Sequence, residues 1–219
     1  MVTGKAIEGQ AVNVNRLGMD IGLMSVDAVG DTPLIVHKWN FSRSKREMPF
    51  DMPRPKRSPV MEFIDSLYWL DGSGNEIEKP HFSEAVTADT SYADIYSELK
   101  KSRFGFPVQA FKRAMVNTGY KQGIIQKITA MGSFAICDEF AVIEGIPDMR
   151  KYEVCGAGIK PVRYLAVFEH WKATLKIKYN KLAISEAEII TLLDLAGSLN
   201  GIGAWSPCKD GMFGMFHCA

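Results

Sequence analysis

The stretch WKATLKIKYNKLAISEAEIITLLDLAGSL, residues 171–199, decides the fold class of this chain. Apolar residues occupy every second position from 173 to 179, with lysine or threonine between them. Because successive side chains of a strand point to opposite faces, this alternation predicts a strand with one buried face. Ser185 and Glu188 then form a capping box, and the apolar residues that follow recur at helical spacing. The stretch therefore predicts a half-buried strand that leads into an amphipathic helix.

The remaining elements extend this pattern across one domain. We expect further strands at 17–29, 134–136, 140–143, 164–168 and 212–218, and helices at 60–70, 91–101, 106–117 and 124–131. Residues 33–38 suit either a second strand or the start of a helix, and residues 145–161 suit a loop. The order of elements predicts a single α+β domain over residues 1–219, with an antiparallel sheet and helices on one of its faces. The other face of such a sheet is free for a ligand or a neighbouring subunit.

Composition and charge indicate an ordinary folded protein. Hydrophobic residues make up 47% of the chain and charged residues 23%, and the formal net charge is +1. The first fifteen residues contain no apolar core of signal-peptide length, and no run approaches a membrane span. We therefore expect a cytoplasmic protein that does not contact a membrane.

The chemistry-bearing residues do not form a catalytic or metal-binding pattern. The four cysteines and four histidines are dispersed, with no CxxC or HExxH spacing, so we expect no metal and no cofactor. Asp138 and Glu139 are adjacent but suit a turn between strands, and no nucleophile motif is present. The sequence favours a protein that is not an enzyme, although a metal-dependent nuclease built on this carboxylate pair stays open.

The most distinctive functional signal is a basic segment, HKWNFSRSKREMPFDMPRPKRSP, residues 37–59. Its cations outnumber its two carboxylates, Glu47 and Asp51, and its prolines forbid an interior helix or a central strand. Cations with interleaved aromatic rings on an extended segment suit a phosphate backbone with stacked bases. The alternative is a solvated insertion whose charge only keeps the protein soluble.

The candidate nucleic-acid-binding residues follow from this segment. Within it they are Lys38, Trp39, Phe41, Arg43, Lys45, Arg46, Arg54, Lys56 and Arg57. Outside it, the helix cations and one row of strand lysines would extend the path: Lys112, Arg113, Lys172, Lys176 and Lys178. The lysine row also suits the solvated face of an ordinary antiparallel strand, which is the commoner case. The glycine-rich tail, residues 201–219, matches no nucleotide-binding motif, and we expect it to pack the last strand closely beside the preceding helix.

Several stretches resemble a widespread family of phage and prophage proteins that are often encoded near recombination and replication genes. The likeness is carried by TPLIVHKW (32–39), FGFPVQAFKRAMVNTG (104–119), FAVIEGIPDMR (140–150), RYLAVFEHWKATLKIKYN (163–180) and residues 184–219. More remotely, the first strand, the basic loop and the glycine-rich end resemble the RAMP proteins that coat CRISPR guide RNA, which have a ferredoxin-like fold. Phage single-strand annealing proteins are a second remote likeness. The tail departs from the RAMP glycine loop because Lys209 is its only lysine or arginine.

Together the residues and the resemblance imply a protein that binds single-stranded nucleic acid in recombination or replication. We expect a homo-oligomer in the cytoplasm of a bacterial host, with DNA favoured over RNA. The alternative is a protein-binding module, such as a phage inhibitor of a CRISPR-type host defence complex, which would use the basic segment as a docking peptide.

Overall fold

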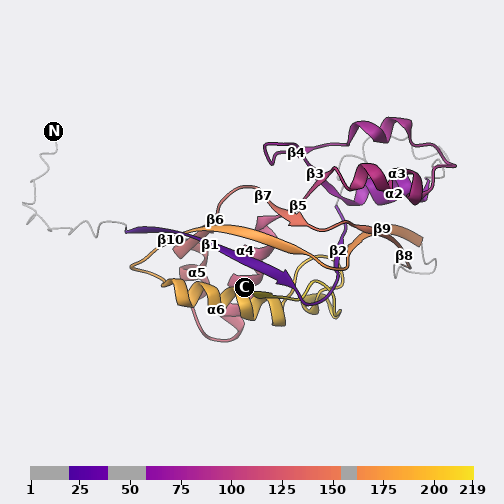
Figure 1. Ribbon diagram of the computed structural model, residues 1–219. Coiled ribbons are helices and arrows are strands. Elements are labelled where there is room, and N and C mark those ends of the chain that lie inside the picture. The colour runs from indigo at the N-terminus through magenta and orange to yellow at the C-terminus, as the bar shows by residue number, and fades with distance from the viewer. Residues whose placement is uncertain (1–19, 39–57, 154–161) are drawn as a thin grey trace, which may run out of the picture.

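The computed structural model describes residues 20–38, 58–153 and 162–219 (Figure 1). Within these ranges no helix is both long enough and apolar enough to cross a bilayer. The elements form a mixed α+β structure with antiparallel strand pairing, so the predicted fold class is confirmed.

The main sheet has the strand order β11-β1-β10-β7-β5-β3-β4, and β6 pairs with β10 beside this path. Its strands are β1 (Ile21–Gly30), β3 (Tyr68–Leu70), β4 (Glu76–Ile77), β5 (Arg103–Pro107), β6 (Phe134–Ile136), β7 (Phe140–Glu144), β10 (Lys172–Asn180) and β11 (Phe216–Cys218). The alternation predicted for β10 is confirmed, because burial switches at every residue from Ala173 to Tyr179. One face of β10 joins the core, and the lysine face points away from it.

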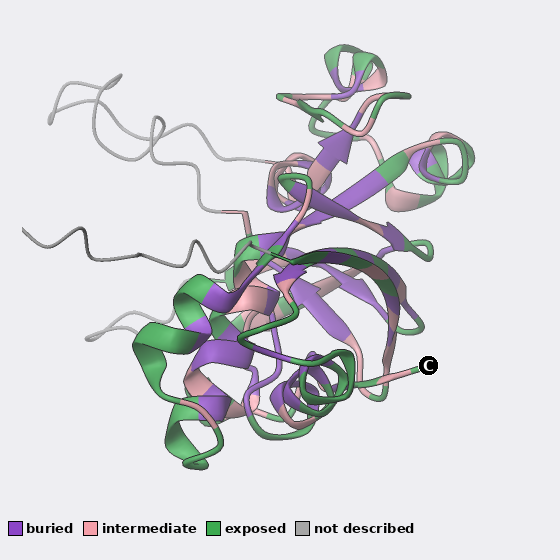
Figure 2. Cartoon of the chain, turned by 90° about the vertical axis from the view of Figure 1, so that its left-hand side faces the viewer, coloured by how far each residue is buried: buried purple, intermediate pink, exposed green. Residues whose placement is uncertain are grey.

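The helices are α2 (Pro59–Ser66), α3 (Tyr92–Leu99), α4 (Val108–Lys121), α5 (Lys127–Ser133) and α6 (Glu186–Leu199), with short 3₁₀ turns at His81–Ala85 and Pro207–Lys209. Figure 1 shows α4 and α6 on the same side of β1 and β10. Their buried side chains, such as Phe111 and Leu192, join Leu175 of β10 in one hydrophobic core. Figure 2 shows this division as helices that are purple along one side and green along the other. The capping box predicted for α6 is present at Ser185 and Glu188.

A second, smaller sheet has the strand order β2-β9-β8, from β2 (Leu34–Val36), β9 (Val162–Phe168) and β8 (Asp148–Glu153). Figure 1 places it at the right-hand end of the molecule. Of the two alternatives for residues 33–38 it selects the strand, at 34–36, and it corrects the predicted loop at 148–153, whereas residues 154–161 lie outside the described residues. The alternation in β8 is weak because most of its residues are only partly buried, so its pairing with β9 decides its conformation.

The helix predicted at 60–70 is also corrected, since α2 ends at Ser66 and the chain turns into β3. Leu67 is already extended, with φ −94° and ψ 151°. The Ser66 hydroxyl donates to the Phe63 carbonyl at 2.7 Å and accepts the Ala166 N–H of β9 at 3.0 Å. Trp69 of β3 reaches back to donate from Nε1 to the Ile64 carbonyl at 2.9 Å. These contacts replace the last helical turn by a strand of the main sheet.

Close approach of α6 to β11 depends on Gly197. A Cβ at this position would lie 1.9 Å from the Phe216 carbonyl oxygen. Gly132 of α5 offers a contrast, because a Cβ there meets no atom within 4 Å. The two helical glycines thus differ in whether a neighbouring element needs the missing side chain.

We expect Gly197→Ala to destabilise the protein by about 3 kcal/mol, because the added methyl group forces α6 away from β11. Gly132→Ala should stabilise it by about 0.5 kcal/mol, since alanine loses less backbone entropy in a helix. Urea unfolding of both variants and the parent measures these changes. Equal free energies of unfolding for the two variants would contradict the proposed packing of α6.

Candidate nucleic-acid interface

The basic segment leaves the described fold directly after the second sheet. The chain runs from β2 through His37 to Lys38 and is described again from Ser58, which caps α2. Eight of the predicted nucleic-acid-binding residues lie between, outside the described residues: Trp39, Phe41, Arg43, Lys45, Arg46, Arg54, Lys56 and Arg57. The structure therefore fixes where this segment starts and ends.

Lys38, near the start of the segment, is bound to the folded domain through both its side chain and its backbone. Its ammonium group forms an ion pair with Glu76 of β4 and lies 5.5 Å from the centre of the Tyr68 ring. Its backbone N–H donates to the Ser66 carbonyl at 2.9 Å. Because the side chain is only 13% exposed, most of its contacts are with the protein itself.

The lysine row of β10 lies on the outer face of the main sheet, as the alternation predicted. Lys172 is paired with Asp27 at 2.6 Å, and this contact lowers the pKa of the Asp27 carboxyl. Lys176 lies 3.6 Å from Asp138, and both side chains are well exposed. Lys178 is exposed and forms no ion pair with any residue that the structure describes. Lys176 and Lys178 are the more available cations of the row.

The helix cations do not join this row. Lys112 of α4 donates to the Met131 carbonyl at 3.1 Å and lies 5.9 Å from the centre of the Phe134 ring. The helix that carries Lys112 and Arg113 packs on the inner face of the sheet, whereas the lysines of β10 point outward. The prediction that the two sets extend one path is therefore not supported by their placement.

The glycine-rich tail instead covers one face of the second sheet. Ala204, Trp205 and Phe213 pack against a small cluster formed by Ile35, Leu165 and Val167. The Ala204 N–H donates to the Ile35 carbonyl at 3.0 Å, and the Gly214 N–H donates to the Pro33 carbonyl at 2.9 Å. The predicted packing of the last strand beside the preceding helix is confirmed by the close approach of β11 to Gly197 of α6, and the tail also bonds β2.

Trp205 holds an unusual position in this tail. Its φ is +49°, in the left-handed region that bulky residues rarely adopt. The Phe213 N–H donates to its carbonyl at 3.0 Å, and a Cβ at Gly211 would lie 1.8 Å from the same oxygen. The indole ring lies against the Tyr152 ring, with the two centres 4.9 Å apart and the planes at 30°. The fold therefore holds two partly exposed aromatic rings together at this end of the molecule.

Three basic side chains are linked to this end of the molecule by strand pairing or by their charges. Arg163 of β9 is the direct cross-strand partner of Tyr152, and its guanidinium lies 3.5 Å from Glu62. Lys209 is exposed and donates from Nζ to the Gly203 carbonyl at 2.9 Å. Partial desolvation lowers the pKa of His37, and the charges of Arg163 and Lys209 lower it further. We call His37, Tyr152, Arg163, Trp205 and Lys209 the tail cluster.

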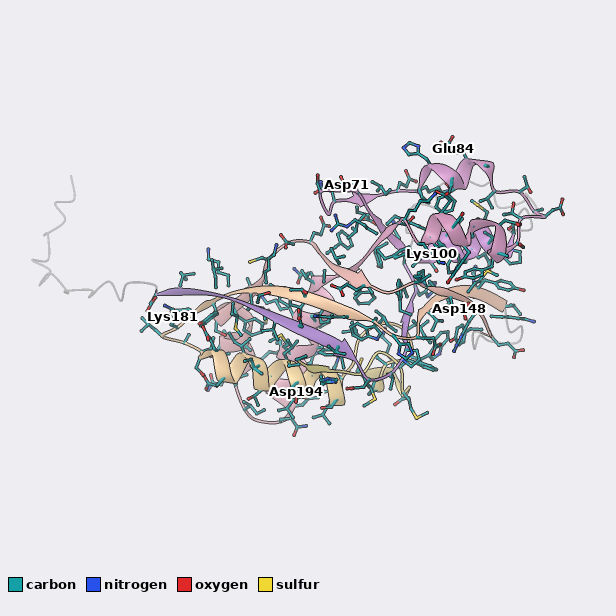
Figure 3. All side chains as sticks on the ribbon, in the orientation of Figure 1. Asp71, Glu84, Lys100, Asp148, Lys181 and Asp194 are labelled. Atoms are coloured by element: carbon teal, nitrogen blue, oxygen red, sulfur yellow. The ribbon has the colours of Figure 1, made fainter. Side chains whose placement is uncertain are left out.

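Sequence reasoning missed most of the tail cluster because its members come from four separate segments. The one signal available was that Lys209 is the only cation of the tail. Tyr152 and Arg163 belong to a hairpin whose first strand was predicted as loop. Figure 3 shows how side chains crowd this end of the molecule, near the labelled Asp148.

The carboxylate pair weighed for a nuclease forms the predicted turn between β6 and β7. Asp138 has φ +67°, and its carboxylate faces Lys176. Within residues 20–38, 58–153 and 162–219, no group of three or more histidine, cysteine, aspartate or glutamate side chains could hold a metal ion. The described residues thus give the nuclease alternative no further support.

Comparison with known proteins does not assign the chain. No protein-family model matches it, and no match was found among curated proteins.

We expect His37 to make the stability of the protein pH-dependent. Its pKa in the fold is lowered from the ordinary 6.5, so the unfolded state binds a proton more readily as the pH falls below that value. The free energy of unfolding should therefore decrease between pH 7.5 and 5.5, a range above the usual titration of carboxylates. Urea unfolding across this range should show a weaker decrease for His37→Gln, with His81→Gln as the control. An unchanged pH dependence in His37→Gln would contradict this assignment.

Proposed function

We propose that the protein binds single-stranded nucleic acid at the end of the molecule formed by the second sheet, the tail cluster and the basic segment. The observation that carries this proposal is the position of the tail cluster. Arg163 and Lys209 lie close enough to His37 to lower its pKa, and His37 is the residue at which the basic segment begins. The folded cations thus lie near the residue at which the basic segment begins.

The chemistry of this place suits a phosphate backbone with accessible bases. Positive charge attracts the backbone, and release of counterions makes the affinity strongly dependent on salt. Trp205 and Tyr152 are partly exposed rings that the fold holds in place. Two further aromatic residues, Trp39 and Phe41, come shortly after His37 in the sequence. Stacking of a base on such a ring contributes about 1–3 kcal/mol. Bases of a duplex are already stacked on one another, so this combination favours a single strand.

Two features make the lysine row of β10 less suited to binding nucleic acid than the tail cluster. Lys172 is neutralised by Asp27, and Lys176 faces Asp138. No aromatic side chain alternates with the lysines on that face of the strand. The lysine row therefore suits a secondary contact, or the solvated face of an antiparallel strand.

The biological setting that we propose rests on the resemblance to phage and prophage proteins. It places a homo-oligomeric, non-enzymatic protein in the cytoplasm of a bacterial host, acting in phage recombination or replication. The same resemblance, to proteins encoded near recombination and replication genes, favours DNA over RNA as the ligand. Binding of the protein to oligo-dT and to oligo-U of equal length compares the two.

The basic segment is tested by replacing Arg54, Arg57 and Lys56 together by glutamine. We expect the affinity for a 30-nucleotide oligo-dT to fall about tenfold or more, and the slope of log affinity against log salt to become shallower by about 2, since roughly 0.7 counterion is released per phosphate contact of a single strand. Fluorescence anisotropy over a range of salt concentrations measures both quantities.

The matched control replaces three exposed lysines outside the segment and the tail cluster, Lys121, Lys127 and Lys181, by glutamine. It changes the net charge by the same amount and should leave the affinity within about twofold, because distant charges are screened. Equal losses in the two triple variants would show that only net charge matters. Absence of binding by the parent protein would overturn the proposal in favour of a protein partner.

The contribution of the folded part is tested by comparing Lys209→Gln with Lys178→Gln. Both remove one exposed cation, but only Lys209 belongs to the tail cluster. We expect Lys209→Gln to reduce the salt slope by about 0.7, as for one lost phosphate contact, and Lys178→Gln to reduce it less. A larger effect of Lys178→Gln would place the path along β10 instead.

A further inference from the structure

The first part of β1 is an open edge of the main sheet. β1 pairs with β10 from Ile21 to Val29, but on its other side it pairs with β11 only from Ala28 to Gly30. In Figure 1 the C-terminus lies beside the later part of β1. Among the described residues no strand covers the stretch from 21 to 26 on this side.

The backbone groups at this edge can be assigned from their neighbours. The Asp20 carbonyl accepts from the Lys181 N–H, and the Gly30 N–H donates to the Trp171 carbonyl. Even-numbered residues of β1 therefore direct their backbone groups toward β10. The Asp27 carbonyl accepts from the Ala219 N–H, so odd-numbered residues turn to the other side. Ile21, Leu23 and Ser25 thus present their N–H and C=O groups at the open edge.

This edge lacks the features that usually prevent strand addition. Proteins protect exposed edges with charged residues, proline or bulges. The stretch IGLMSV, residues 21–26, contains neither a charge nor a proline, and its pairing with β10 is regular. Leu23 is 72% exposed and Ile21 is 39% exposed. An extended, apolar and uncharged edge is suited to pairing with another strand.

We propose that a second copy of this chain pairs with the open edge, antiparallel and about a two-fold axis through Leu23. In this register Leu23 lies opposite Leu23 of the partner subunit, and Ile21 lies opposite Ser25 of the partner subunit. Directly opposed residues of this kind exchange both of their N–H···O=C bonds. Every open N–H and C=O group of the three residues is then satisfied, because Leu23 is the midpoint between the other two. This inference does not depend on nucleic-acid binding.

Charge at both ends of the edge is compatible with this pairing. Asp20 is paired with Lys181 at 3.1 Å, and Asp27 is paired with Lys172 at 2.6 Å. The flanking carboxylates of the two copies are thus already neutralised within each chain, and the paired stretch adds no charge. The interface is isologous, so it closes at a dimer.

Pairing would join the two main sheets into one. The β10 strands of the two copies would lie three strand spacings apart, about 14 Å. Because Lys178 is the cross-strand partner of Leu23, the outer face at the two-fold axis would read Lys178, Leu23, Leu23 and Lys178. The register thus places the most exposed large apolar residue of the edge, Leu23, against itself, which gives a direct test.

The test uses the full chain with Leu23→Glu, with Leu23→Lys, and with an equimolar mixture of the two. We expect the parent to be a dimer by sedimentation velocity at about 5–100 µM, concentrations at which a dimer with a micromolar Kd is populated. Each single variant should be a monomer, or dissociate about tenfold more readily, because like charges then face each other across the axis. The mixture should recover a dimer, since glutamate then faces lysine.

A dimer as tight as that of the parent in either variant, or a mixture that dimerises no better than the single variants although the parent is a dimer, would overturn the proposed register. A monomeric parent would overturn the interface itself. Occupation of the edge by residues 1–19 would give monomers that are indifferent to mixing. Leu182→Glu, which changes another leucine that is 61% exposed, is the matched control and should remain a dimer.

A second variant tests the hydrogen bonds without adding charge. Ser25→Pro removes an N–H group that faces the open edge and leaves the groups that face β10 in place. It should weaken the dimer, whereas Ser25→Ala should not. Circular dichroism confirms that each variant is folded, and equal dimerisation of the two Ser25 variants would overturn the proposal.

Discussion

β1 and β10 pair antiparallel from Ile21 and Asn180 to Val29 and Lys172, and the other strands of the main sheet attach to this pair directly or through a neighbour. The two strands are distant in the sequence, so their pairing closes most of the chain into one loop at a substantial cost in entropy. Burial of the inner face, which includes Val26, Leu175 and Ile177, offsets that cost. Two glycines of β1 also leave room for large rings: a Cβ at Gly22 would lie 2.3 Å from the Tyr179 ring, and one at Gly30 would lie 2.2 Å from Trp171.

The second sheet and the tail lie beside the main sheet built on β1 and β10. Together they form a surface with aromatic and basic side chains. The tail returns from α6 to bond the edge of β2, and its glycines permit approaches that side chains would block. As a result Trp205 is held in a left-handed conformation against Tyr152, beside Arg163 and Lys209. Residues held in such sparsely populated conformations often mark functional sites, because the surrounding structure must maintain them against their conformational cost. The open edge of β1 begins near Asp20, at the end of β1 away from this cluster.

Local pattern was sufficient where an element is amphipathic over its whole length. β10 and α6 were predicted with nearly correct bounds, because alternation and a capping box are properties of neighbouring residues. The helix of α2 was predicted, but its end and the strand β3 were not, because the apolar residues from 60 to 70 suit a helix throughout. The helix stops because Ser66 bonds β9 and Trp69 enters the main sheet, and both contacts join residues far apart in the chain. β8 was missed for the same reason, since its half-exposed residues carry little pattern of their own.

The sequence by itself determined the fold class, the outward lysine face of β10, the packing role of the tail and the position of the basic segment. These depend on the order and spacing of apolar, polar and charged residues, which act over short distances along the chain. Only the tertiary structure decided that Lys112 and Lys178 lie on opposite sides of the sheet, that Trp205 packs on Tyr152, and that the charges of Arg163 and Lys209 act on His37. Among the described residues, only it left the first part of β1 without a neighbouring strand on the side away from β10. Each of these depends on which strands pair and in which register, and that is set by burial summed over the whole core.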